Sequence, residues 1–277
     1  MVSVHDAVTG GRALFPASSL HAVNELLAEG DIEAVFQPMW RLDGSAVFAY
    51  EALSRPHPRY GLSGPLQAFE IAERFGRAAE LDRLCLRSIL ASVDGLPENA
   101  LLFINLSPYF LTHRSFDAAA LRADVEAVGL EPARVVFEVT ERSLIAAEII
   151  LPHVLAIREQ GLSVALDDVG TGTNGFDMLR KIPFEYIKID REIVLGAMDD
   201  QRSRSALLAI LTFAKESGAL AVAEGIENDD MLRLVRTLDR GWARPVTGLV
   251  FGIQGFLFGR PAQGFIYPAR VGAGKVA

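Results

Sequence analysis

The stretch LSVALDDVGTGTNGFDMLRKIPFEYIKID, from Leu162 to Asp190, holds two apolar runs separated by a glycine-rich turn and a short amphipathic segment. The first run ends in Asp167 and Asp168, and the second ends in Lys188-Ile189-Asp190. Adjacent carboxylates at the end of a buried strand are costly unless a cation lies between them, and a divalent metal is the simplest such cation. The alternative is that Asp168 caps the helix that follows.

Apolar runs of the same kind recur along the chain, mostly separated by helical segments. Strands are predicted at Glu33–Trp40, Ser45–Leu53, Leu101–Ser107, Arg134–Thr140, twice within the opening stretch, at Ala219–Gly225, and in a run ending near Gln254. Alternation of strands and helices implies a parallel sheet, and eight strands in about 250 residues predict an α/β fold, a TIM-like (β/α)8 barrel. Asp43-Gly44 is a hairpin signal, so the first strand should run antiparallel to the rest.

One domain is expected, with residues 1–17 as an N-terminal arm, 18–268 as the barrel and 269–277 as a C-terminal tail. Half of the 277 residues are hydrophobic and the net charge is −8, which argues against a broad basic surface for DNA or RNA. The lone cysteine, Cys85, excludes an intrachain disulfide framework. No signal-like or membrane-spanning apolar segment is present in the sequence, so a cytoplasmic location is predicted.

Polar side chains fall where the predicted strands end. They are Glu51, Asn105, Glu138, Asp167, Asp168, Lys188, Glu224 and Gln254. Each alone has a structural explanation, such as a turn former or a salt-bridge partner. In a barrel of this type, however, the carboxyl ends of the strands converge on the face that carries the active site. Their recurrence at one topological position therefore predicts a site.

The predicted ligands are all oxygens, because the five histidines lie away from these strand ends. Oxygen ligands favour Mg²⁺, Mn²⁺ or Ca²⁺ over Zn²⁺. Five converging acids also suit two metals, and two-metal sites are typical of phosphoester hydrolysis. Lys188 is a candidate to orient the nucleophile, and Arg55 offers a fork for a phosphate oxygen.

Glu51-Ala52-Leu53-Ser54-Arg55 resembles the signature of the EAL-domain cyclic di-GMP phosphodiesterases. Further motifs resemble that family in the same order: Phe36-Gln37-Pro38, Asn105-Leu106-Ser107-Pro108, Glu138-Val139-Thr140-Glu141, Asp167-Asp168 with Gly170-Thr171-Gly172, Lys188-Ile189-Asp190, Ala223-Glu224-Gly225-Ile226-Glu227, and Gln254-Gly255-Phe256 with Gly259-Arg260-Pro261. The resemblance covers roughly residues 18 to 268. A match to a single tripeptide would be weak evidence for the family, but eight motifs in the family's order are specific to it.

The resemblance implies hydrolysis of cyclic di-GMP to linear pGpG with Mg²⁺ or Mn²⁺ in a bacterial cytoplasm. The converging acids suit two such ions, and Ca²⁺ is expected to bind without supporting turnover because its coordination geometry is looser. It assigns metal ligation to Glu51, Asn105, Glu138, Asp167 and Asp168. Lys188, Glu224 and Glu51 become the catalytic residues, and Lys188 and Glu224 would hold or activate the attacking water. Substrate contacts are implied for Gln37, Leu53, Arg55, Asp190 and Gln254. Glu141 becomes the tether of the loop after Asp168, which in the family links the site to dimerisation, so a homodimer is a further expectation.

Two departures from the family pattern stand out. Val169 replaces the usual aromatic residue, and Thr173-Asn174-Gly175 replaces a Tyr-Ser-Ser-like end of the loop. An extra apolar segment also lies near Trp242–Phe251. The alternative function is therefore a module that binds cyclic di-GMP or a protein partner without turnover. Retention of every acid favours the enzyme, and a different metal-dependent barrel enzyme, such as an aldolase, is the more remote option.

Overall fold

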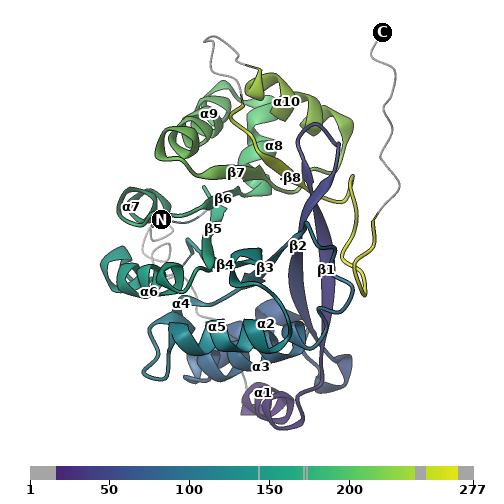
Figure 1. The fold of residues 1–277 in the computed structure, drawn as a ribbon, viewed down its shortest axis with the longest axis vertical. Helices are drawn as coiled ribbons and strands as arrows, with labels where there is room; N and C mark the ends of the chain where they lie inside the picture. The colour runs from purple at the N-terminus through teal and green to yellow at the C-terminus, as the bar shows by residue number, and fades with distance from the viewer. Residues whose placement is uncertain (1–16, 143, 171, 173, 241–247, 268–277) are drawn as a thin grey trace, which may run out of the picture.

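The computed structural model describes residues 17–142, 144–170, 172, 174–240 and 248–267. Within them, eight strands close into a barrel in chain order (Figure 1). They are β1 (Ile32–Arg41), β2 (Val47–Pro56), β3 (Leu101–Asn105), β4 (Val135–Thr140), β5 (Ser163–Val169), β6 (Tyr186–Ile189), β7 (Leu220–Ala223) and β8 (Gly252–Gln254). The predicted TIM-like barrel is confirmed.

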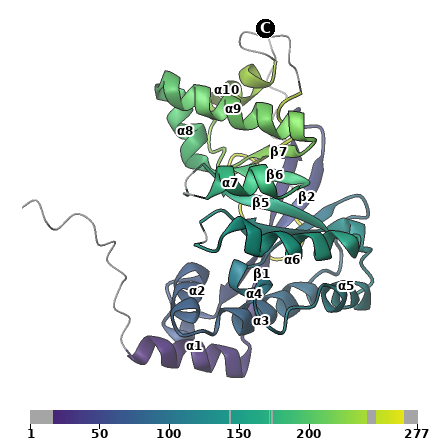
Figure 2. The ribbon, with the colours of Figure 1, turned by 90° about the vertical axis from the view of Figure 1, so that its left-hand side faces the viewer.

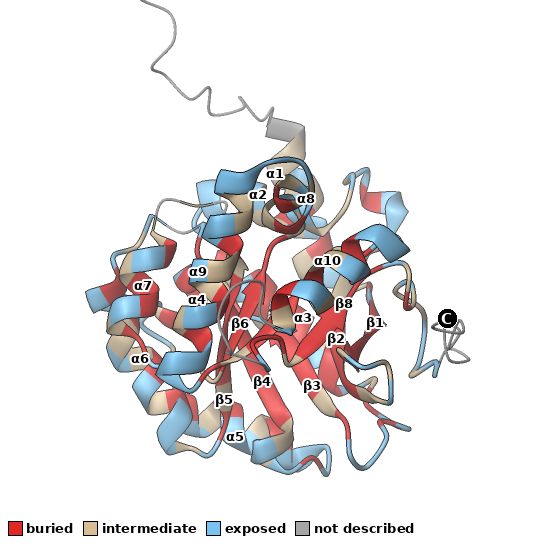
Figure 3. Cartoon of the chain, turned by 90° about the horizontal axis from the view of Figure 1, so that it is seen from above, coloured by how far each residue is buried: buried red, intermediate tan, exposed pale blue. Residues whose placement is uncertain are grey.

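Helices surround the barrel, with their buried residues toward it and their exposed residues outward (Figures 2 and 3). They are α1 (Ala17–Glu29), α2 (Pro65–Arg74), α3 (Ala78–Leu90), α4 (Pro108–Leu111), α5 (Ala118–Ala127), α6 (Ala147–Glu159), α7 (Gly175–Lys181), α8 (Arg191–Asp199), α9 (Gln201–Ser217) and α10 (Asp229–Asp239). Short 3-10 turns lie at Pro58–Tyr60 and Pro132–Arg134. Of the described helices, none is long and apolar enough to cross a membrane.

The first strand is reversed, as the hairpin signal predicts. β1 pairs antiparallel with β2 and, at the closure of the barrel, with β8, while the remaining neighbours are parallel. The turn between β1 and β2 is fixed locally, because the Asp43 carboxylate accepts a hydrogen bond from the Ser45 amide at 2.8 Å and Gly44 has a φ of 73°. The turn lies at the amino-terminal end of the parallel strands, and β1 runs from the mouth of the barrel down to it.

Inside the barrel, one layer of apolar side chains fills the amino-terminal half. It consists of Met39, Ala49, Phe103, Val136, Ala165, Tyr186 and Val222, and Phe48 packs edge-on against Phe103. Successive side chains of a strand point to opposite faces, so the next interior residue lies two positions further along. Those next positions carry the polar side chains of the site.

The structure differs from the sequence predictions at β2 and α8, and some predicted segments lie outside the described residues. Glu51 lies in the middle of β2 rather than at its end, because β2 continues to Pro56 along β1 after its pairing with β3 has stopped at Ala52. Helix α8, between Asp190 and α9, was not predicted. Residues 1–16 of the predicted arm, the predicted tail 269–277, and residues 242–247 of the extra segment lie outside the described residues.

Candidate metal and active site

The interior alternation of the strands gathers the predicted site residues into one polar layer. On β2 to β7 they lie two positions after a residue of the apolar layer, and on β8 two positions after Gly252: Glu51, Asn105, Glu138, Asp167, Lys188, Glu224 and Gln254. Gln37 joins the same layer from β1, which runs in the opposite direction, so it precedes Met39 by two positions. The barrel therefore has an apolar floor and a polar mouth at the carboxyl ends of its parallel strands.

Lys188 lies at the centre of this layer and is fully buried. Its Nζ is 2.6 Å from Glu138 Oε1, 2.8 Å from Glu224 Oε1, 3.1 Å from Asp167 Oδ1 and 3.5 Å from Glu51 Oε1. Burial alone would lower the pKa of this ammonium, but the surrounding carboxylates raise the pKa well above its ordinary value. Lys188 is therefore charged, and it holds four carboxylates from four strands together.

Glu51 is positioned by amide side chains. Gln254 Nε2 donates to Glu51 Oε2 at 2.5 Å and to Gln37 Oε1 at 3.2 Å, and Asn105 Nδ2 donates to Glu51 Oε1 at 3.3 Å. Burial would raise the pKa of Glu51, but Lys188 and the hydrogen bonds from Gln254 and Asn105 outweigh it, so the pKa is lowered. The Glu51 carboxylate is thus kept ionised inside the barrel.

The pKa values of Glu138 and Glu224 are raised, whereas that of Glu51 is lowered. Burial raises the pKa of Glu138 well above its ordinary value against the opposing effect of Lys188, and the carboxylates of Glu51 and Asp167 add to the rise. The pKa of Glu224 is also raised well above its ordinary value, by burial and by Asp167 and Glu51. Four carboxylates facing one ammonium hold too much negative charge to stay fully ionised without a further cation.

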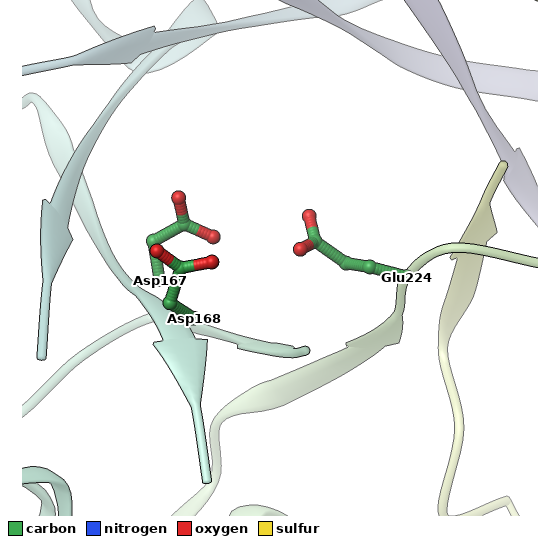
Figure 4. Close-up of side chains that lie close together, drawn as sticks. All are labelled: Asp167, Asp168 and Glu224. Carbon is green, nitrogen blue, oxygen red and sulfur yellow. The ribbon is translucent and has the colours of Figure 1, made fainter. Parts of the chain in front are cut away.

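Asp167, Asp168 and Glu224 offer oxygens that all lie within 4.8 Å of one another (Figure 4). Asp168 reaches this position through a φ of 60°, in the left-handed region, which it alone adopts among the described non-glycine residues. Burial and the neighbouring Asp167 raise the pKa of Asp168 to about 6. The cap interpretation of Asp168 is wrong, because the residue before α7 is Asn174.

The acids fit a divalent cation on two grounds. Glu138 Oε2 is buried and, within the described part of the chain, has no hydrogen-bond partner. Such an oxygen is costly to bury unless a cation or another donor reaches it. The surrounding oxygens are carboxylates and amides, the ligand chemistry that Mg²⁺, Mn²⁺ and Ca²⁺ take. The site therefore suits the hard divalent cations expected from the sequence.

Arg142 is a site residue that the sequence reasoning missed. Its Nε lies 3.3 Å from Asp168 Oδ2 and its Nη2 lies 3.5 Å from Asp190 Oδ2, so it joins the ends of β5 and β6. Asp190 also accepts the Glu192 amide at 2.7 Å and caps α8. The signal that could have found it was its position, since Arg142 lies two residues beyond the end of β4 at Thr140.

Glu141 is buried beneath the loop that follows Asp168. Its Oε1 accepts the amide of Gly170 at 3.0 Å and also that of Gly172. A Cβ on Gly175 would overlap the Glu141 carboxylate, so glycine is required there. Of the two loop departures, Val169 is buried and pairs with Ile189, while Thr173 lies outside the described residues.

Two cavities open at the mouth of the barrel. One, of about 250 Å³, is lined by Gln37, Glu51, Lys188, Glu224, Gln254 and their neighbours. The other, of about 570 Å³, is lined by Leu53, Arg55, Asn105, Arg142 and others, and both share Asp167 and Asp168. Each predicted substrate contact except Asp190 therefore lines a cavity beside the acids. The larger of the two volumes lies in the range of pockets that hold small organic ligands.

A family model and several known proteins are similar to this chain over most of its length. The EAL domain family matches residues 20–261. The cyclic di-GMP phosphodiesterase RocR of Pseudomonas aeruginosa is 32% identical over 243 residues, which are 85% of this chain and 58% of that protein. NbdA, a cyclic di-GMP phosphodiesterase of the same organism, is 29% identical over 86% of this chain and 30% of its own length.

Solved structures of similar fold include the PaMucR phosphodiesterase in complex with cyclic di-GMP. Its TM-score is 0.74 at 26% identity, over 88% of this chain and 96% of that chain. Klebsiella pneumoniae BlrP1 in complex with calcium and cyclic di-GMP has a TM-score of 0.73 at 26% identity, over 84% of this chain and 57% of that chain. The chain spans between 28% and 58% of the length of the first four curated relatives that it matches.

Proposed function

This chain belongs to the EAL domain family, and from that premise we propose that it hydrolyses cyclic di-GMP to linear pGpG in a reaction that depends on Mg²⁺ or Mn²⁺. The observation that carries the proposal is the intact polar layer, with Lys188 within 3.5 Å of carboxylates from four strands. RocR and NbdA are named cyclic di-GMP phosphodiesterases, and PaMucR binds the dinucleotide. We propose the bacterial cytoplasm as the location.

The proposed metal ligands are Glu51, Asn105, Glu138, Asp167 and Asp168, around a pair of ions. When bound, the ions supply positive charge that polarises the phosphate and acidifies water. Glu138 contributes the buried oxygen that lacks a hydrogen-bond partner among the described residues. The lowered pKa of Glu51 keeps that ligand ionised, as coordination requires.

Water adds to the phosphorus of one phosphodiester while the P–O bond to a ribose oxygen breaks. The released oxygen takes up a proton and becomes a hydroxyl, which opens the ring. Lys188 and Glu224, which lie 2.8 Å apart, hold and orient the attacking water, and Glu224 accepts its proton. Lys188 remains charged and stabilises the negative charge that develops on the phosphate. Arg55 and the backbone near Leu53 bind the dinucleotide in the adjacent cavity, together with Gln37 and Gln254 at the other side of the acids.

Turnover is the direct test. Cyclic di-GMP is incubated with the protein and Mn²⁺, Mg²⁺ or Ca²⁺, and pGpG is measured by chromatography. We expect product with Mn²⁺ and Mg²⁺ and little with Ca²⁺, whose looser geometry positions the groups less well. Asp167→Asn, which changes charge and almost no volume, should lower turnover by orders of magnitude while the circular dichroism spectrum stays unchanged. Tight calorimetric binding without turnover in any metal would instead support the receptor alternative.

We also propose a homodimer that uses the face formed by the loop after β4, α6 and α7, which lie side by side (Figure 1). Leu144, Ile149 and Phe176 on these elements are 80%, 53% and 74% exposed. Exposed apolar side chains on neighbouring elements are typical of an interface. Phe176→Asp should shift the protein toward a monomer in sedimentation velocity, whereas a wild type that sediments as a monomer at all concentrations would contradict the proposal.

A further inference from the structure

A third cavity, of about 640 Å³, lies at the opposite end of the barrel from the acids. It is bounded by the β1–β2 hairpin, the end of α9, the end of α10 and the starts of β7 and β8, which meet at one side of the molecule (Figure 1). Leu220 and Ala221 begin β7, whose other end leads to Glu224, so about 10 Å of strand separates the two sites.

The charge of this cavity is opposite to that of the chain. Its charged lining residues are Arg41, Lys215, Arg236 and Arg240, with Asp43 and Asp239. Four cations against two acids leave a local excess of +2 in a chain whose net charge is −8. Both carboxylates accept backbone hydrogen bonds, Asp43 from the Ser45 amide at 2.8 Å and Asp239 from the Val250 amide at 2.9 Å. The cavity is therefore an attractive place for an anion.

Two of the cations are held in place by the fold. The Arg41 guanidinium lies 4.0 Å from the centre of the Phe251 ring, and that ring packs edge-on against Phe48. Arg236 donates from Nε and Nη2 to the Leu42 carbonyl at 3.4 and 3.3 Å. Guanidinium groups fixed in this way lose less conformational entropy on binding an anion, and their planar fork matches a phosphate.

The floor of the cavity is apolar. It is formed by Leu42, Leu220, Leu249, Val250 and Phe251, with alanines at 219 and 221. A simple inorganic anion would leave this surface uncovered, whereas an organic phosphate would place its charge on the arginines and its apolar part on the floor. The volume is in the range of pockets that hold small organic ligands.

We propose that this cavity is a second binding site, which takes a phosphorylated small molecule of nucleotide size and is distinct from the metal and active site. The phosphate lies among the four cations of the cavity, and the organic part lies over Leu220 and Phe251. The site does not depend on phosphodiesterase activity, because none of its lining residues belongs to the polar layer at the mouth.

GMP is the probe, with guanosine as its uncharged counterpart. Both are titrated into the isotopically labelled 277-residue chain in the presence of EDTA, and amide chemical shifts are followed by NMR. We expect saturable shifts with GMP at residues 218–221 and 248–250, and binding of guanosine at least about tenfold weaker because a charge-assisted contact is missing. Shifts confined to residues 167–170, or equal affinity for guanosine, would overturn the proposal.

The double variant Lys215→Glu/Arg240→Glu tests the site itself, since both side chains are exposed. GMP affinity should fall by about tenfold or more. Arg233→Glu is the matched control, because this residue lies on the same helix α10, is exposed and does not line the cavity. GMP affinity should stay within about twofold of wild type in the control. Equal GMP affinity in the double variant and wild type would refute the site. A protein that does not bind GMP but sediments with phosphatidylglycerol vesicles would also refute it.

Discussion

Replacing Lys188 by methionine removes the ammonium that Glu51, Glu138, Asp167 and Glu224 share, while nearly preserving the volume of the side chain. In the metal-free protein, these four buried carboxylates then face one another without that counter-charge. We expect the variant to fold less stably than wild type when metal is withheld and to recover more than wild type does when metal is supplied.

The size of the effect follows from the distances. Lys188 Nζ lies between 2.6 and 3.5 Å from the four carboxylates. A pair of unit charges about 3 Å apart attracts by about 5.5 kcal/mol at an effective dielectric constant of about 20. Repulsion among the carboxylates and the desolvation of all five groups oppose this attraction. Truncation of one partner in a buried ionic cluster therefore costs about 3–5 kcal/mol of unfolding free energy.

Urea unfolding at neutral pH in EDTA, repeated with excess Mn²⁺, measures both quantities. Removal of the Lys188 ammonium should increase the affinity of the folded protein for Mn²⁺. A tenfold increase in this affinity stabilises the folded state by about 1.4 kcal/mol more when Mn²⁺ is in excess. The control is Lys181→Met, which removes a surface lysine paired with Asp177 at 2.7 Å and should cost at most about 1 kcal/mol. If Lys188→Met loses less than the control in EDTA, or gains no more from Mn²⁺ than wild type, the counter-charge role of Lys188 is wrong.

Three further predictions concern single residues. Arg55→Ala should weaken cyclic di-GMP binding in Ca²⁺ by about 1.5–3 kcal/mol through a lost phosphate contact, measured by calorimetry, while unchanged affinity would remove Arg55 from the substrate site. Glu141→Gln should raise the Mn²⁺ concentration needed for half-maximal turnover, because the amides of Gly170 and Gly172 lose a charged acceptor; an unchanged metal requirement would show that the tether does not act on the site. Burial raises the pKa of Asp82 to about 7, so folding favours its protonated form and this favourable contribution is lost as the pH rises toward 7. Asp82→Asn should therefore gain about 2–3 kcal/mol relative to wild type between pH 5 and 8 in EDTA, measured by urea unfolding, and a constant difference would contradict the raised pKa.

Strand order and strand polarity were predictable because their signals are local. Period-two patterns, apolar runs and the Asp43-Gly44 turn each act within a few residues, so the barrel and its reversed first strand could be derived before any contact was known. The ends of the strands were less predictable from the sequence. Glu51 lies within β2 because β1 offers a longer hydrogen-bonding partner than β3 does, and the length of a neighbouring strand is not visible in the sequence of β2 itself.

The sequence by itself determined which oxygen ligands are available and that they fall near the carboxyl ends of successive strands. Only the tertiary structure decided how they share charge, because closure of the barrel sets distances between residues such as Glu51 and Glu224 that are far apart in the chain. Closure places Lys188 among four carboxylates, brings Arg142 to Asp168, and leaves Arg41 and Arg240 around one cavity at the opposite end. Electrostatic energy and pKa depend on those distances and on burial, so the charge of each site is a property of the folded chain.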